Sequence, residues 1–259
     1  MLPSFLGEGA ITRVRTAGEV PLLGHRVDAK PGDWILENAG TVAVVSAEGK
    51  LIDLGGLGGH DEITAIDSAV FLAFDAAHTE IVKIEPIAGT AVLHVERRVL
   101  EKPITLHELF GFVGPVLKIE SAVAAAAPAA ASLAVTLGER VGWGNVPTWA
   151  EGHGFANQAG SQAGDFLARE SFGVSYAMCS DGGRLISRFG GGDPGFYASA
   201  LTGEETIPVP AQGLSARRVI SIAQSPLSLG RAAVTLPCVQ RGGLDLFPMP
   251  PSLPESARI

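Results

Sequence analysis

The feature that most constrains this sequence is the alternation of apolar and polar residues along short stretches of chain. In "AVLHVER", Leu93 and Val95 alternate with His94 and Glu96. Successive side chains of a β-strand point to opposite faces, so this pattern predicts strands that bury one face and expose the other. Comparable patterns recur in the stretches 41–46, 116–121, 217–225 and 232–238.

Turn-forming residues separate these stretches. The sequence holds 33 glycines and 17 prolines, many of them in clusters such as "SAEGK", "GGLGGHD" and "FGGGDPG". Hydrophobic residues make up 46% of the chain, which is enough for a large core. Short strands with frequent turns predict an all-β fold, a large antiparallel two-layer β-sandwich.

One segment departs from the strand pattern. Thr105 and Glu108 have the spacing of a capping box, ahead of an apolar run that ends near Gly114 and Pro115. We therefore predict one short helix here, at one end of the sandwich.

The chain is expected to form one main domain. We predict an N-terminal lead-in strand over 1–31, a β-sandwich domain over 32–240 and a Pro-rich tail over 241–259, with an Ala/Pro-rich loop at 122–131. The Ala-rich stretch is too short and too weakly apolar for a membrane span, which needs about 20 apolar residues. The first residues show no signal-peptide pattern.

The charge of the chain argues against two classes of partner. The net charge is −8, and the sequence has no cluster of basic residues, only the isolated pairs Arg97–Arg98 and Arg217–Arg218. Nucleic-acid binding requires a basic surface that releases counterions, and polybasic membrane docking requires a similar surface. We therefore exclude nucleic acid as a partner and expect no membrane span.

The two cysteines, Cys179 and Cys238, stand outside any CxxC motif. This excludes a zinc site built from thiolates and favours two buried free thiols. Whether the two cysteines pair stays open, because pairing depends on their separation in space.

The stretch "TLGERVGWGNVPTWAEGHGF" holds the strongest candidates for ligand binding. Trp143 and Trp149 flank a turn, and aromatic rings near loops can stack on sugars. Glu151 and His153 could then hydrogen-bond to sugar hydroxyls. The alternative is structural: both tryptophans fill the end of the sandwich, and the glycines permit the bend.

A second pair of candidates is His94 and Glu96. On a strand they share a face, about 6.5–7 Å apart, which suits an acid–base pair or two metal ligands. A half-exposed strand face would look the same. The triplet His60–Asp61–Glu62 is expected to be a solvated turn, and His107 is assigned to the predicted helix.

Common catalytic signatures are missing from the sequence. It contains no GxSxG, HExxH or phosphate-binding glycine motif. We accordingly expect no metal and no cofactor.

Several short motifs together resemble a known family. They follow the order found in the galactose-mutarotase-like β-supersandwich module of exported proteins of myxobacteria and relatives. In that family the module often precedes a PHP-type metallohydrolase domain or carboxypeptidase-regulatory-like domains. The motifs are "GDWILEN" (32–38), "KLIDLGG" (50–56), "HDEI" (60–63), "TLGERVGWGN" (136–145), "EGHGF" (151–155) and "GVSYAM" (173–178).

The resemblance implies an exported accessory module whose own chemistry is not established. It places Gly138, Trp143 and Gly144 at a corner where a strand ends. It places Gly173, Ser175 and Tyr176 on a later strand, and it puts catalytic metal ligands in a downstream domain.

Three functions remain open from the sequence. The first is a non-enzymatic binding or scaffold module for carbohydrate or a neighbouring protein chain, centred on Trp143, Trp149, Glu151 and His153. The second is a mutarotase- or epimerase-type enzyme that pairs His94 or His153 with Glu96 or Glu151 as acid and base. The third is self-assembly into a homo-oligomer.

Overall fold

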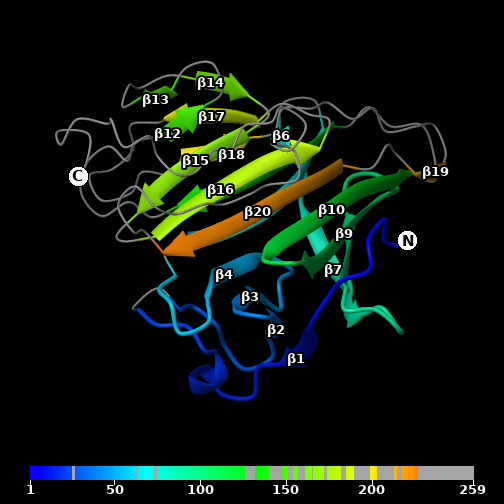
Figure 1. Ribbon diagram of the computed structural model, residues 1–259. Helices are drawn as coiled ribbons and strands as arrows, with labels where there is room; N and C mark the ends of the chain where they lie inside the picture. The colour runs from blue at the N-terminus through cyan, green and yellow to red at the C-terminus, as the bar shows by residue number, and fades with distance from the viewer. Residues whose placement is uncertain are drawn as a thin grey trace.

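Nearly all regular structure in this protein is antiparallel β-sheet, as the computed structural model shows (Figure 1). The structure describes residues 1–24, 27–61, 63–72, 75–125, 132–139, 148–150, 154–156, 161–164, 166–171, 174–181, 185–189, 199–202, 213–214 and 218–226. Within these residues every strand pairing is antiparallel, and an all-β sandwich is confirmed.

The first sheet is built mainly from the N-terminal part of the chain. Its order is β1-β2-β3-β4-β5-β11, and β6 pairs with β5. The strands are β1 (Ala10–Arg13), β2 (Trp34–Asn38), β3 (Thr41–Val45), β4 (Leu51–Gly56), β5 (Ile63–Leu72), β6 (Asp75–Ala76) and β11 (Ser132–Glu139).

The second, larger sheet has the order β13-β12-β15-β16-β20-β10-β9-β8-β7, and β19 pairs with β10. Its strands are β7 (Thr79–Pro86), β8 (Leu93–Val99), β9 (Ile104–Val113), β10 (Val116–Ala125), β12 (Thr148–Ala150), β13 (Gly154–Ala156), β15 (Phe166–Ser171), β16 (Val174–Asp181), β19 (Gly213–Leu214) and β20 (Arg218–Pro226). A third sheet joins β14 (Ser161–Gly164), β17 (Leu185–Phe189) and β18 (Ser199–Thr202).

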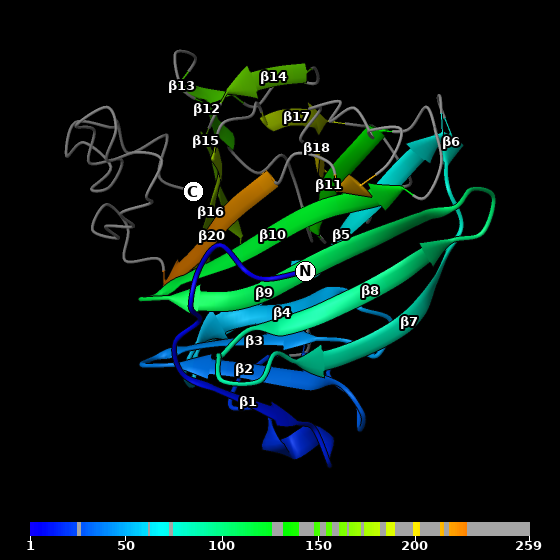
Figure 2. The same ribbon diagram turned by 90° about the vertical axis from the view of Figure 1, so that its right-hand side faces the viewer.

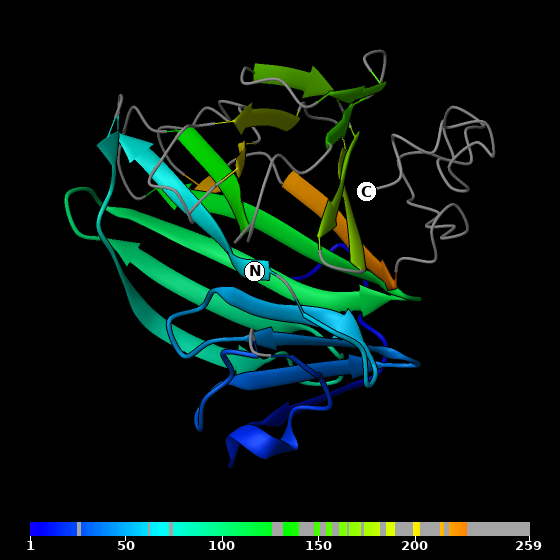
Figure 3. The ribbon, with the colours of Figure 1, turned by 90° about the vertical axis from the view of Figure 1, so that its left-hand side faces the viewer.

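The core lies between the first two sheets. Strands β7 to β10 face the viewer in Figure 2, and strands β1 to β4 face the viewer from the opposite side in Figure 3. One buried cluster draws side chains from both sheets: Leu36, Ala43, Val45, Leu51, Leu54 and Ile66 from the first, and Leu93, Val95, Phe110, Phe112, Leu117 and Ile119 from the second. The alternation read from the sequence therefore places the apolar residues of β8 and β10 on the core face, as predicted. The expected exposure of the other face is wrong, because His94 is 5% exposed and Glu120 is fully buried.

Strand β3 is buried on both faces. Val45 belongs to the cluster between the sheets, whereas Val42 and Val44 pack on the opposite face against Val14 and Leu22. The segment that follows β1 thus covers the outer face of the first sheet, which explains why "TVAVV" carries no charged residue.

The short helix predicted from Thr105 is wrong, because Ile104–Val113 is strand β9. This strand pairs along its length with β10 and along much of it with β8, so its backbone groups find partners on both sides. Glu108 is 1% exposed and ion-paired instead of capping a helix. The helical turn that the described residues do contain is a 3₁₀ turn at Ala17–Glu19.

The Ala/Pro-rich loop predicted at 122–131 is wrong for its first four residues. Ala122–Ala125 continue β10, and Ala122 and Ala125 are buried. Residues 126–131 lie outside the described residues, and Ser132–Glu139 form β11. Among the described residues no helix is long and apolar enough to cross a membrane.

A buried arginine connects the two sheets. Arg97 on β8 is 4% exposed, and its Nη2 lies 3.1 Å from Oε2 of Glu108 on β9. The same Nη2 donates to the carbonyl of Gly49 at 2.6 Å, and Nη1 donates to the carbonyl of Ser68 at 3.4 Å. Gly49 lies in the β3–β4 turn and Ser68 in β5, so both carbonyls belong to the first sheet.

Gly49 also allows this close approach. Its φ is +77°, and a Cβ there would lie 2.6 Å from Cγ1 of Val95. A side chain at this turn would therefore push the first sheet away from β8.

We predict that Glu108→Ala lowers the free energy of unfolding by about 3–5 kcal/mol, because it removes a buried, charged partner of the Arg97 guanidinium. Urea denaturation followed by circular dichroism measures the change. Glu80→Ala is the matched control, since Glu80 pairs with Arg98 on the exposed face and should contribute less than about 1 kcal/mol. Equal losses in the two variants would contradict the prediction.

Candidate functional site

Three polar side chains gather on the face of the large sheet that points away from the core. His94 and Glu96 come from β8, and His107 comes from β9. The register pairs Glu96 directly with His107, which puts His94 on the diagonal to His107. One ligating atom from each of the three lies within 4.8 Å of the others. We call these three residues the His–Glu–His cluster.

The two imidazole rings of the cluster are stacked. Their centroids are 5.3 Å apart with an interplanar angle of 25°, and His94 Nε2 lies 3.1 Å from His107 Nδ1. One of these nitrogens donates to the other, and the tautomers decide which. Glu96 Oε2 lies 3.9 Å from His107 Nδ1.

The three residues of the cluster differ in how much of each is exposed to solvent. His94 is 5% exposed, and the side chains of His107 and Glu96 are 14% and 23% exposed. Leu109 and Ala122, which face the same side of β9 and β10, are fully buried. The cluster is therefore anchored at its base and open on one side.

The N-terminal segment crosses the same face. Figure 2 shows it in front of the strands of the large sheet, and both N and Oγ of Ser4 donate to Glu120 Oε2 at 2.8 Å. Glu120 pairs with Leu109, the residue opposite His94. A Cβ on Gly111 would lie 2.9 Å from Phe5, so this segment packs closely on β9.

A lysine borders the cluster on its other side. Lys83 on β7 pairs with Glu96, and its Nζ lies 3.9 Å from Glu96 Oε2 and 3.0 Å from Glu85 Oε1. The hydrogen bond to Glu85 raises the pKa of Lys83, so this side chain stays positively charged.

Both histidines favour the neutral form. Burial, the neighbouring His107 and nearby positive charges lower the pKa of His94 from 6.5 to about 4, although Glu96 acts in the opposite direction. Burial also lowers the pKa of His107. At neutral pH the cluster therefore offers two neutral imidazoles and one carboxylate. Such a set can form hydrogen bonds with hydroxyl groups, exchange protons or hold a metal ion.

The structure describes three of the site residues predicted from the sequence, and the other three lie outside the described residues. His94 and Glu96 share the predicted face, and their ligating atoms lie together. Trp149 lies in β12, which pairs with β13 and β15. Trp143, Glu151 and His153 lie outside the described residues.

Sequence reasoning missed His107, because the capping-box pattern assigned it to a helix. Polarity does not alternate over 106–110, because Glu108 shares the core-side face with Leu106 and Phe110. The local pattern therefore gave no signal that this segment is a strand.

Two aspartates near the first sheet serve the fold. Asp61, expected in a solvated turn, is fully buried, and its Oδ1 accepts the backbone N–H of Leu54 at 2.9 Å. Asp53 is also buried, and its Oδ1 accepts the N–H of Asp28 at 2.9 Å. Burial raises the pKa of Asp53 to about 6. The expectation of a solvated turn is thus wrong at Asp61, because a short polar side chain satisfies the backbone of a neighbouring strand.

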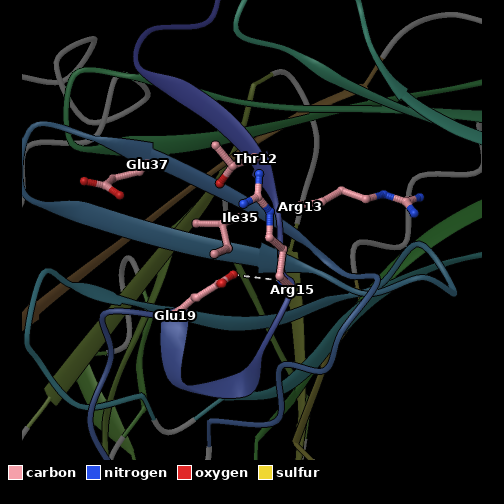
Figure 4. Close-up of a pocket in the computed structure, with 6 residues that line it drawn as sticks. All are labelled: Thr12, Arg13, Arg15, Glu19, Ile35 and Glu37. Carbon is pink, nitrogen blue, oxygen red and sulfur yellow. Dashed lines mark hydrogen bonds between the residues drawn. The ribbon is translucent and has the colours of Figure 1, made fainter.

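A shallow pocket of about 300 Å³ lies elsewhere, at the edge of the first sheet (Figure 4). Residues of β1, β2 and the turn after β1 line it, among them Thr12, Arg15 and Glu19, and the Arg15 N–H donates to Glu19 Oε2 at 2.8 Å. Its lining includes no residue of the His–Glu–His cluster.

Comparisons with known proteins agree on the fold. No family model and no curated protein matches the sequence. A galactose mutarotase-like protein from Lactobacillus casei has a TM-score of 0.54 at 9% identity, covering 75% of this chain and 100% of that chain. A candidate aldose 1-epimerase from Escherichia coli K12 has a TM-score of 0.51 at 9% identity, covering 74% and 98%. A 4-alpha-glucanotransferase from Thermococcus litoralis has a TM-score of 0.52 at 9% identity, covering 85% of this chain and 40% of that enzyme.

These similarities establish the fold alone. The protein has the fold of galactose mutarotase-like and aldose epimerase-like proteins. Identities this low leave the chemistry of the site to be argued from its own residues.

We predict that the ring of His94 titrates with a pKa of about 4. Nitrogen-detected NMR of the histidine rings measures this directly, and His107→Ala should raise the value, because it removes a neighbouring ring that disfavours the charged form. A titration of His94 near 6.5 in the wild type would contradict it.

The same shift predicts how stability depends on pH. The folded pKa of His94 is below the unfolded value, so the unfolded chain takes up a proton first as the pH falls. The contribution of His94 to the free energy of unfolding is therefore complete above pH 6.5 and decreases from there to about pH 4. Asp53 has the opposite effect, because its raised pKa makes the folded state take up a proton first, so its contribution to stability increases as the pH falls. The measurement therefore compares the wild type with His94→Gln, since Asp53 is present in both. The variant should lose less stability on acidification.

Proposed function

We propose that this protein is a non-enzymatic carbohydrate-binding module, with the His–Glu–His cluster as a site for sugar hydroxyls. The observation that carries the proposal is the convergence of His94, Glu96 and His107 on the outer face of the large sheet, where the side chains of His107 and Glu96 are 14% and 23% exposed. Each neutral imidazole donates one hydrogen bond and accepts another, and the carboxylate accepts. Neighbouring hydroxyls of a sugar need such an alternation of donors and acceptors.

The fold supports this choice of ligand class. The similar structures named above include a galactose mutarotase-like protein and a 4-alpha-glucanotransferase, and both names refer to proteins of sugar chemistry. A shared fold does not determine the ligand, whereas the cluster is a feature of the chain itself.

The aromatic platform predicted from the sequence is a second part of the proposal. Trp149 lies on β12, five strands away from β9 in the same sheet. At about 4.8 Å per strand, the two strands are about 24 Å apart along the sheet. A single sugar ring cannot reach both. We therefore propose that a ligand that uses Trp143, Trp149, Glu151 and His153 together with the cluster is a chain of several sugars.

Binding is tested with a glycan array that includes single sugars and oligosaccharides, followed by isothermal titration of the sugars retained. We predict that Glu96→Gln weakens binding at least about tenfold, because a hydrogen bond to a charged group contributes about 1.5–3 kcal/mol.

Glu80→Gln is the matched control for this experiment. It alters an exposed carboxylate of the same sheet outside the cluster, and it should leave the affinity unchanged. If no sugar binds the wild type, the proposal is wrong.

A second candidate function is that of an aldose 1-epimerase. The observation in its favour is a histidine and a carboxylate side by side on one face, the pair that the reaction needs. A base takes the proton from the anomeric hydroxyl while an acid protonates the ring oxygen, and the bond between the anomeric carbon and that oxygen breaks. Rotation and the reverse step give the other anomer. The pair His153 and Glu151 is the other choice from the sequence.

Polarimetry of freshly dissolved galactose or glucose separates the two functions. Acceleration that is lost in Glu96→Gln supports the enzyme, and binding without acceleration supports the module. Export and a second protein chain as partner, or self-assembly, stay predictions from the sequence.

A further inference from the structure

We propose that His94, His107 and Glu96 form a binding site for a divalent transition-metal ion such as Zn²⁺. The ligand atoms are His94 Nε2, His107 Nδ1 and Glu96 Oε2. This inference does not rest on carbohydrate binding, because the metal alone can be titrated.

The nitrogen geometry is close to what a metal requires. Nitrogen ligands lie about 2.0–2.1 Å from Zn²⁺, so two of them are about 3.0 Å apart at a right angle and about 3.4 Å apart at the tetrahedral angle. His94 Nε2 and His107 Nδ1 are 3.1 Å apart, within this interval. In the hydrogen-bonded pair these two nitrogens point at each other, so rotation of the rings is needed to turn both lone pairs toward one ion.

The carboxylate is the adjustable ligand. Glu96 Oε2 lies 3.9 Å from His107 Nδ1, which is about 0.5 Å longer than the edge of a tetrahedral site. Its side chain is 23% exposed, so rotation about its own bonds can close this distance. Two imidazoles and one carboxylate are a ligand set known for zinc and for non-haem iron.

The rigidity of the sheet favours the site. All three residues lie on two adjacent paired strands, and the register fixes Glu96 opposite His107. His94 is held in place by its burial. Sites built on strands keep their geometry better than sites built on loops.

Metal binding does not require either imidazole of the His94–His107 pair to release a proton to solvent. Each neutral imidazole keeps one N–H, and a metal needs the other nitrogen free of hydrogen. The proton now shared between His94 and His107 moves to the nitrogen that points away from the metal, and no proton has to leave the pair.

Lys83 opposes the metal. Its ammonium lies 3.9 Å from Glu96 Oε2 and already interacts with the carboxylate that the ion would use. Because the lysine side chain is 42% exposed and also bound to Glu85, it can turn away when the ion arrives. The wild-type site should therefore bind more weakly than the same ligands without this lysine.

The experiment titrates the purified chain, freed of metal by a chelator, with Zn²⁺ in calorimetry and with Co²⁺ in visible absorption. We expect one ion per chain and a Co²⁺ spectrum typical of nitrogen and oxygen ligands. His107→Gln and Glu96→Gln should each weaken binding at least about tenfold. Lys83→Ala should tighten it about fivefold, as expected for the loss of one charge about 4 Å away in water-like surroundings.

His78→Ala is the matched control. His78 and Glu101 form another histidine–carboxylate pair, at 2.6 Å on the surface. Within the part of the chain that the structure describes, this pair belongs to no group of three metal-ligating residues. The control should leave affinity and stoichiometry unchanged. Circular dichroism checks that each variant folds. Should His107→Gln fail to fold, NMR of the wild type replaces it, because Zn²⁺ must shift the ring signals of His94 and His107 together.

Two results would overturn the proposal. One is the absence of saturable binding to the wild type. The other is an affinity that is the same in wild type, Glu96→Gln and Lys83→Ala, with ring signals of His94 and His107 that do not move.

Discussion

The buried contact between Arg97 and Glu108 sets the register on which both faces of the large sheet depend. Arg97 reaches the carbonyls of Gly49 and Ser68 in the first sheet, so it fixes β8 against that sheet. Side chains alternate along a strand, so Arg97 facing inward requires Glu96 to face outward, and Glu108 facing inward requires His107 to face outward. A slip of one residue would bury the cluster and expose the ion pair. The core contact and the candidate site are therefore two sides of the same pairing.

Local sequence patterns predicted β8 correctly, but they did not predict β9. The alternation of Leu93 and Val95 with His94 was sufficient to place β8 and the face of the cluster. The error at Thr105 has a physical cause: a capping box describes a helix end in isolation, whereas β9 lies between β8 and β10 and pairs with both. Neighbours distant in the sequence decided the outcome, and His107 was hidden by the same error.

Burial of small and polar residues was harder still to predict. Ala122 was expected in a loop, yet it pairs with His107, where a small side chain leaves room for the imidazole above the sheet. Asp61 was expected in water, yet it accepts a backbone N–H inside the fold. In both positions the residue type suits an exposed loop as well as a buried site, so only the tertiary contacts distinguish the two.

Hydroxyl binding, proton transfer and metal binding all require the same chemical group of the cluster. Each needs a nitrogen lone pair of His94 or His107, so a proton on the ring competes with all three. Burial of both rings, together with the positive charges of the N-terminus and Lys83, makes that proton unfavourable at neutral pH. The fold contributes the platform, as it does in proteins with different activities. The residues of this chain add the pairing of Glu96 with His107, which places a carboxylate beside two imidazoles that are neutral.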